Sequence, residues 1–184
     1  MNYFFNLFIG RKHQAIQANG FMDTGNTLKD ISTGKHVVIA SPEIMYDLLP
    51  RQYHYIVYDY TSGTQPFDRK SALSMPEGIH LVPYRTISSE SDLMLAFDCD
   101  FFFINNRLIR NRPLIGLSRH TLQISHMPKC ILLNSAYFRF ISDFLQTYTI
   151  ALTIAPKRTQ MIAKTIIPIT PPPINETADI VIIY

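Results

Sequence analysis

The chain has 184 residues, of which 47% are hydrophobic and 17% charged, and this balance is typical of a folded chain with a core and excludes a disordered one. The formal net charge of +3 is too small to indicate a nucleic-acid-binding protein. Cys99 and Cys130 lie outside any Cys-x-x-Cys pair, which argues against a zinc or redox motif. We expect two buried free thiols rather than a disulfide, because nothing marks the chain as secreted.

The N-terminal segment, residues 1–9, is apolar and aromatic but short. It has neither the basic start nor the small-residue cleavage site of a signal peptide, and a membrane span needs about 20 apolar residues. A second apolar stretch, residues 138–155, is interrupted by Arg139 and Asp143, which favours an amphipathic helix. We therefore expect the chain by itself to be soluble or peripheral.

Strands predominate among the elements that the sequence predicts. Apolar and β-branched runs bounded by turn residues predict strands, and Ser41-Pro42-Glu43 predicts the start of a helix that ends at Pro50. The strands are expected at 14–22, 36–40, 53–60, 79–87, 93–97, 101–105, 107–109, 113–116 and 130–133, and further helices at 117–123 and from Asn134 or Ser135 to about 148. The expected fold is all-β with a few short helices, as a closed or partly closed barrel.

The tripeptide Asp23-Thr24-Gly25 follows the first of these strands directly. In aspartic proteases, two carboxylates share one proton across a bound water, and Asp-Thr-Gly supplies each of them. The glycine permits a tight turn with its N–H near the carboxylate, and the threonine hydroxyl can bond the partner loop. Asn26 comes next and either bonds the loop backbone or reaches substrate. The tripeptide also fits an ordinary turn after a strand, since Asp and Gly favour turns.

A second signal, Leu114-Ile115-Gly116, stands about 90 residues downstream. In aspartic protease lobes, an apolar-apolar-Gly segment pairs behind the Asp-Thr-Gly loop, where glycine permits close approach of two backbones, and a short helix follows. The chain contains one Asp-Thr-Gly, so activity requires a homodimer in which each copy contributes Asp23. This is the retropepsin arrangement, in which each chain forms a single-lobe barrel.

A flap that closes over the substrate is expected of such an enzyme. The candidate is the turn between the strands at 79–87 and 93–97, which contains Ser88, Ser89, Glu90 and Ser91. This turn has no glycine, and an ordinary exposed hairpin explains it equally well.

No metal or cofactor site is predicted. The six histidines show no metal-binding spacing such as His-x-x-x-His, and the chain has no glycine-rich phosphate loop. The expected protease therefore uses neither a metal nor a cofactor.

The surroundings of Asp23 resemble those of one family, the sporulation sigma-E factor processing peptidases of endospore-forming bacteria. These proteins have Asp-[Ser/Thr]-Gly-Asn followed by Leu, Asp, a Thr-Gly-Lys-like turn and an apolar strand. Five segments of this chain are similar to family segments in the same order: 20–39, 82–86, 93–97, 114–118 and 130–133. The resemblance covers about residues 14–138.

The resemblance implies a membrane-bound aspartic endopeptidase that trims the pro-sequence from an inactive sigma-factor precursor during sporulation. It implies a location at the cell membrane with the protease on the cytoplasmic side, and a signalling protein as activator. Members of the family have an N-terminal membrane half that this chain lacks, so membrane attachment is expected through a segment absent from it.

The expected domain organisation follows from this resemblance and from composition. Residues 1–13 are a stub or linker from the membrane half, or an additional strand, and residues 14–150 are the protease domain. Residues 151–184, with prolines at 168 and 171–173, form an extended or disordered tail. Two alternatives stay open: a retropepsin-like peptidase of a mobile element, and a catalytically silent β-barrel that binds a partner.

Overall fold

The computed structural model describes residues 4–63, 75–85, 92–122, 124 and 130–138. The chain divides into two compact units, one made of residues 1–136 with the C-terminal residue and the other of residues 137–183. The fold and the site below belong to the first unit. The expected tail, 151–184, and most of the helix expected up to 148 lie outside the described residues.

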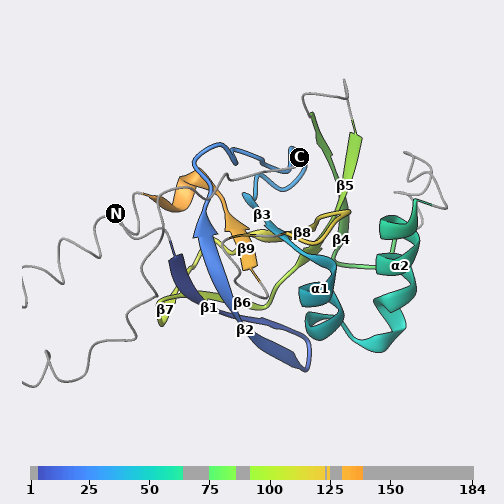
Figure 1. Cartoon of the computed structure of the whole chain (residues 1–184), viewed down its shortest axis with the longest axis horizontal. Coiled ribbons are helices and arrows are strands. Elements are labelled where there is room, and N and C mark those ends of the chain that lie inside the picture. Colours follow the sequence, from blue (N-terminus) through green and yellow to red (C-terminus); the bar gives the residue numbers. More distant parts are fainter. Residues whose placement is uncertain (1–3, 64–74, 86–91, 123, 125–129, 139–184) are drawn as a thin grey trace, which may run out of the picture. The chain divides into compact units, whose positions relative to one another are not determined.

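The described strands form one nine-stranded sheet, accompanied by two short α-helices (Figure 1). The strands are β1 (Phe4–Arg11), β2 (Gln14–Met22), β3 (Val37–Ala40), β4 (Ile79–Tyr84), β5 (Asp92–Asp98), β6 (Phe101–Ile104), β7 (Arg107–Leu108), β8 (Leu114–Leu117) and β9 (Cys130–Leu133). The helices are α1 (Pro42–Leu48) and α2 (His54–Ser62), with 3-10 turns η1 (Arg51–Tyr53) and η2 (Ser135–Tyr137).

The strand order is β4-β5-β8-β3-β9-β2-β1-β6-β7. The prediction of a β-rich fold with few helices is confirmed. The described strands form an open sheet with β4 and β7 at its two edges, and closure into a barrel is not seen among them. None of the helices in the described ranges is long and apolar enough to cross a lipid bilayer.

β1 and β2 form an antiparallel hairpin that leads into the site. Its two-residue loop is Lys12-His13, and Lys12 has the positive φ of 53° that such tight loops require. From Phe5 to Ile9, buried and exposed residues alternate along β1, as expected of a strand with one face on the core. Residues 4–9, for which a stub or a strand was expected, thus belong to β1, and β2 has the predicted bounds.

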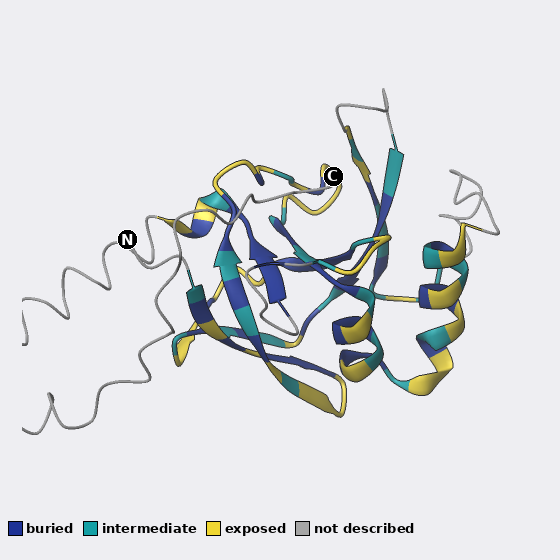
Figure 2. Ribbon diagram, in the orientation of Figure 1, coloured by how far each residue is buried: buried dark blue, intermediate teal, exposed yellow. Residues whose placement is uncertain are grey.

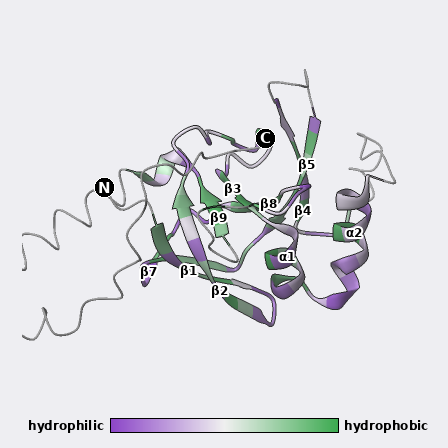
Figure 3. Cartoon of the chain, viewed as in Figure 1, coloured by the Kyte–Doolittle hydropathy of each residue, from purple (hydrophilic) through white to green (hydrophobic). Residues whose placement is uncertain are grey.

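β8 and β9 lie in the middle of the sheet. β9 is parallel to β2 and antiparallel to β3, and β8 is parallel to β3 and antiparallel to β5. Both strands are buried over their whole length (Figure 2), and β9 is continuously hydrophobic (Figure 3). Such short apolar runs are typical of strands covered on both faces.

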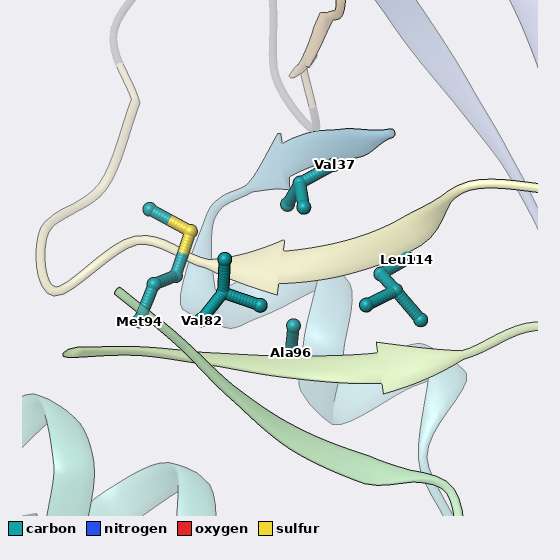
Figure 4. Close-up of a cluster of buried hydrophobic side chains, with 5 residues drawn as sticks. All are labelled: Val37, Val82, Met94, Ala96 and Leu114. Carbon is teal, nitrogen blue, oxygen red and sulfur yellow. The ribbon is translucent and has the colours of Figure 1, made fainter. Parts of the chain in front are cut away.

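One layer of the core lies between β3, β4, β5 and β8 (Figure 4). Its buried side chains are Val37, Val82, Met94, Ala96 and Leu114. Gly116 belongs to this layer, since a Cβ there would come within 2.5 Å of Met94 Sδ and 2.9 Å of Val37 Cγ1. The glycine is therefore required by packing side chains, and not by the approach of two backbones that we expected.

Residues 53–60 correct one prediction, because they form η1 and α2 instead of a strand. The buried residues of this segment are Tyr53, Ile56, Val57 and Tyr60. Their spacing of three and four residues matches the period of a helix, which the alternation of aromatic and polar residues hides. Gly63, with a φ of 66°, ends α2 in the left-handed conformation.

The helix expected at 117–123 is also wrong for the residues that the structure describes. Leu117 is the last residue of β8, and residues 118–122 form no helix. The N–H of Ser118 instead donates to the carbonyl oxygen of Ala40 at 2.9 Å, which prolongs the pairing of β8 with β3.

Three local predictions are confirmed. The helix expected after residue 41 is α1. Asn105 and Asn106 form a tight turn with φ values of 47° and 65°. Cys99 and Cys130 are buried free thiols, and burial raises the pKa of each to about 12.

Candidate active site

Asp23 is the first residue after β2, and the sheet fixes its position. Met22 lies opposite Leu133 in the parallel pairing of β2 with β9. The N–H of Asp23 donates to the carbonyl oxygen of Leu133 at 3.2 Å, so the pairing continues into the site. Since β1 pairs with β2 on its other side, the strand that leads to Asp23 is held along both edges.

The Asp-Thr-Gly segment folds into a tight turn around its own carboxylate. The N–H of Gly25 donates to Oδ1 of Asp23 at 2.9 Å, and the N–H of Asn26 donates to the carbonyl oxygen of Asp23 at 3.2 Å. The first bond confirms the expected approach of the glycine N–H to the carboxylate. It fixes how the carboxylate is oriented relative to the loop.

Burial changes along this loop. Asp23 and Asn26 are each 5% exposed, whereas Thr24 and Gly25 between them are exposed. The loop is thus anchored at both ends and presents its middle outward.

The side chain of Asn26 bonds the backbone, which is the first of the two roles expected for it. Its Nδ2 donates to the carbonyl oxygen of Val37 at 3.1 Å. Its Oδ1 accepts the N–H of Leu28 at 3.1 Å. One buried amide therefore ties the site loop to the start of β3.

Asn134 follows β9 directly and is a site residue that the sequence analysis missed. It is 1% exposed. Its Nδ2 lies 2.8 Å from the carbonyl oxygen of Leu28, 3.2 Å from that of Val37 and 3.4 Å from Oδ1 of Asn26. Its Oδ1 accepts the N–H of Ala136 at 3.0 Å, which is the capping role expected from the sequence.

A recognisable signal for Asn134 was present in the sequence. An amide stands immediately after an all-apolar strand, where the chain must satisfy buried backbone groups. What the sequence does not show is that this strand pairs with the one leading to Asp23.

Asp30, also buried, organises the turn that follows the site loop. Its Oδ2 accepts the hydroxyls of Ser32 at 2.7 Å and Thr33 at 2.6 Å and the N–H of Thr33 at 2.9 Å. Burial alone would raise the pKa of Asp30, but hydrogen bonds from Thr33 and Ser32 outweigh it and the pKa is lowered. The N–H of Asp30 also donates to the carbonyl oxygen of Lys35 at 2.9 Å, which closes the turn.

Asp98, at the end of β5, is held by two side chains. Its Oδ1 lies 2.5 Å from Nζ of Lys35, and its Oδ2 lies 3.1 Å from Nε2 of His80. Asp30 is therefore committed to a turn, and Asp98 to its contacts with Lys35 and His80. Within the described ranges, no three His, Cys, Asp or Glu side chains are grouped so that they could hold a metal ion.

The segment Leu114-Ile115-Gly116 forms most of β8, one strand further from the site than β3. The strand directly beside β2 is β9, and both β9 and β3 lie between β2 and β8. β8 is linked to the site through β3, because Val37 of β3 pairs with Leu114 of β8. The carbonyl oxygen of Val37 also accepts hydrogen bonds from the amides of Asn26 and Asn134. Support of the Asp23 loop by β8 stays a prediction, and β8 would act on the loop only through β3.

The candidate flap residues Ser88, Ser89, Glu90 and Ser91 lie outside the described residues. The strands that flank them, β4 and β5, pair antiparallel with Tyr84 opposite Asp92. This last rung is reinforced, since Asp92 accepts the hydroxyl of Tyr84 at 3.0 Å and Nη2 of Arg119 at 3.1 Å.

The chain is similar to known proteins. A family model described as "Sporulation factor SpoIIGA", a peptidase family, matches residues 1–135. The chain belongs to this family. The match includes both Asp23 and Asn134, and it confirms the resemblance inferred from the five sequence segments.

One curated relative is the sporulation sigma-E factor-processing peptidase of Priestia megaterium. It is 24% identical over 123 residues, which cover 64% of this chain and 39% of the relative. The chain thus spans well under half of that relative's length. No solved structure matches the chain significantly.

Proposed function

We propose that this chain is the protease part of a sporulation peptidase that cleaves an inactive sigma-factor precursor, with Asp23 as its catalytic carboxylate. The observation that carries the proposal is the Asp23 carboxylate itself. It is buried at the end of a strand held on both edges and is oriented by the N–H of Gly25 at 2.9 Å. Membership of a peptidase family and the printed function of the relative support the substrate class.

The chemistry needs two carboxylates, and one chain contributes one Asp-Thr-Gly. Two copies related by a two-fold axis would bring the two Asp23 side chains together across a water molecule. The ionised carboxylate takes a proton from this water, and the oxygen of the water attacks the scissile carbonyl carbon. At the same time the other carboxyl donates its proton to the carbonyl oxygen. Collapse of the resulting diol breaks the C–N bond, and the amine leaves with the proton.

The exposure of the middle of the loop supports a partner copy. Thr24 and Gly25 are exposed although the residues on either side are buried. An exposed Thr24 hydroxyl is free to bond the backbone of the partner loop and hold the two carboxylates coplanar. A homodimer with a retropepsin-like lobe in each copy is the assembly that we propose.

The proposal extends to the location of the whole protein. We place it at the cell membrane, with this part on the cytoplasmic side and a signalling protein as its activator. The match to only 39% of the relative leaves length there for a membrane-anchoring part. Genomic sequence upstream of Met1 that encodes several apolar spans of about 20 residues would support this location, and its absence would contradict it.

Substitution of Asp23 by Asn tests the mechanism. Asn has nearly the same shape but cannot exchange the proton, so cleavage of the purified precursor should fall at least about 1,000-fold. Asp59→Asn, which makes the same chemical change on α2, is the matched control and should cleave normally. Circular dichroism should show both variants folded. Cleavage by Asp23→Asn at more than about a tenth of the normal rate would mean a protease that does not use Asp23, and no cleavage by the unaltered chain would favour a binding module.

A further inference from the structure

The end of β9 contacts the site loop at both of its ends. Leu133 accepts the N–H of Asp23 through its carbonyl oxygen at 3.2 Å. Two residues later, the N–H of Ser135 donates to the carbonyl oxygen of Asn26 at 2.8 Å. The tetrapeptide that begins with Asp23 and ends with Asn26 is therefore bracketed by residues 133 and 135.

Asn134 stands between these two contacts and fills the space behind the loop with its amide. Its two Nδ2 protons are shared among the carbonyl oxygens of Leu28 and Val37 and the Oδ1 of Asn26. Asn26 Nδ2 donates to the same Val37 oxygen. Two buried amides thus link three segments: the site loop, the start of β3 and the end of β9.

The geometry leaves few residue types that could do this. The side chain needs an N–H₂ of Asn length, because it must reach Leu28 O at 2.8 Å from a position that is 1% exposed. It also needs an acceptor for the N–H of Ala136. Ser and Asp supply the acceptor for the cap but no donor that reaches the carbonyl of Leu28.

We propose that Asn134 is a positioning residue for the catalytic carboxylate, and this inference rests on the proposed function of Asp23. Two carboxylates that share a proton must stay coplanar, and errors of about 0.5 Å are enough to impair such a site. The amide of Asn134 keeps the loop at a fixed distance from β9 and β3 and so sets the direction in which the Asp23 side chain leaves the sheet. It does not touch the reacting atoms.

The test uses the full-length protein and two variants that separate the cap from the contacts with the loop. Asn134→Ser and Asn134→Asp both retain an acceptor for the N–H of Ala136. Leu48→Ala in α1 is the control, since Leu48 is fully buried and its truncation lowers stability without removing any of the hydrogen bonds that Asn134 makes.

In assays run well below the melting temperature of the variant, we expect Asn134→Ser to lower kcat about 10- to 100-fold and to change KM less than about 2-fold. We also expect one limb of its pH–rate profile to move by about one pH unit or more, because the two carboxylates no longer share the proton in the same geometry. Asn134→Asp should behave alike, which keeps the test decisive if one variant does not fold. Leu48→Ala, assayed equally far below its own melting temperature, should keep the kcat and both limbs of the pH–rate profile of the unaltered protein.

A readout independent of activity separates this inference from the proposed function. Amide hydrogen exchange at Gly25 and Asn26 should quicken at least about 10-fold in the Asn134 variants and not in Leu48→Ala. Exchange, kcat and pH limbs that match those of Leu48→Ala would reduce Asn134 to a helix cap and overturn the inference. Faster loop exchange together with full cleavage by Asp23→Asn would refute the proposed function while leaving the anchoring of the loop in place.

Discussion

Two buried carboxylates, seven residues apart, show how contacts determine what a side chain can do. Asp30 receives hydrogen bonds from two hydroxyls and from backbone N–H groups within a single turn. Asp23 sits at the end of a strand with the Gly25 N–H on one oxygen and an exposed threonine beside it. The carboxylate of Asp30 therefore stabilises a turn, whereas that of Asp23 is held at the end of a strand beside exposed residues.

Replacement of Asp30 by Asn should lower the free energy of unfolding by about 1–2 kcal/mol at pH 7, because the hydrogen bonds lose their charged acceptor. The pKa of Asp30 is lowered in the folded state, so its contribution is present above the unfolded pKa of about 4 and is lost as the pH falls through the folded value. Urea unfolding at pH 7 and near pH 2 would measure this. A difference between variant and parent that is as large at the acidic pH would contradict the account.

The sequence was sufficient for the residues whose chemistry is local. Asp23, Gly25 and Asn26 were identified because they stand together in one turn after a strand, where the N–H of Gly25 bonds the carboxylate of Asp23 two residues earlier. Asn134 was not, because its partners Leu28 and Val37 are about 100 positions away and only the pairing of β9 with β2 and β3 brings them together.

At the scale of elements, the strand beside β2 is β9 and not β8, the apolar-apolar-Gly strand that we expected there. The apolar-apolar-Gly strand, β8, packs the core against β3 and β5. The neighbour of β2, the strand that leads to Asp23, is β9, whose sequence is equally apolar but has no glycine. Apolar strands of four residues are interchangeable by composition, so pairing partners cannot be read from them.

Gly116→Ala tests the close packing around β8. A Cβ would come within 2.9 Å of Val37 Cγ1, on a stiff β-branched side chain, and within 2.5 Å of the more flexible Met94 Sδ. We expect a loss of about 1–3 kcal/mol in the free energy of unfolding, as for an overpacked core. Thermal unfolding in a cycle with Met94→Ala should show that the added methyl costs less once Met94 is shortened. An unchanged cost would mean that the strain arises elsewhere.

Helices were the elements that the sequence predicted least well. Residues 53–60 were assigned to a strand because aromatic and polar residues alternate there, yet their buried positions follow helical spacing. The helix expected after Gly116 came from the pattern of aspartic protease lobes, and here Ser118 continues the pairing with β3 instead. Start signals that depend on local chemistry, such as Ser41-Pro42-Glu43 at the start of α1, were dependable.

At the scale of the whole molecule, the described sheet carries Asp23, the carboxylate that we propose to be catalytic, in a loop whose central residues are exposed. The proposed function requires a second such loop from another copy, so assembly and activity should change together. Asp23 and Thr24 of one copy would then act only together with the same residues of a second copy. A lone chain should therefore fold without cleaving its substrate.

The most direct measurement is the cleavage rate of mixed dimers that contain one normal chain and one Asp23→Asn chain. The two chains would bear different affinity tags, and the mixed pairs would be isolated by successive purification on both. A site shared between two copies should leave these pairs with no more than a few per cent of the activity of normal dimers, since the one remaining carboxylate has no second carboxylate with which to share a proton. Mixed pairs with about half the normal activity would show that each chain acts alone, and the two-chain aspartic site would be wrong.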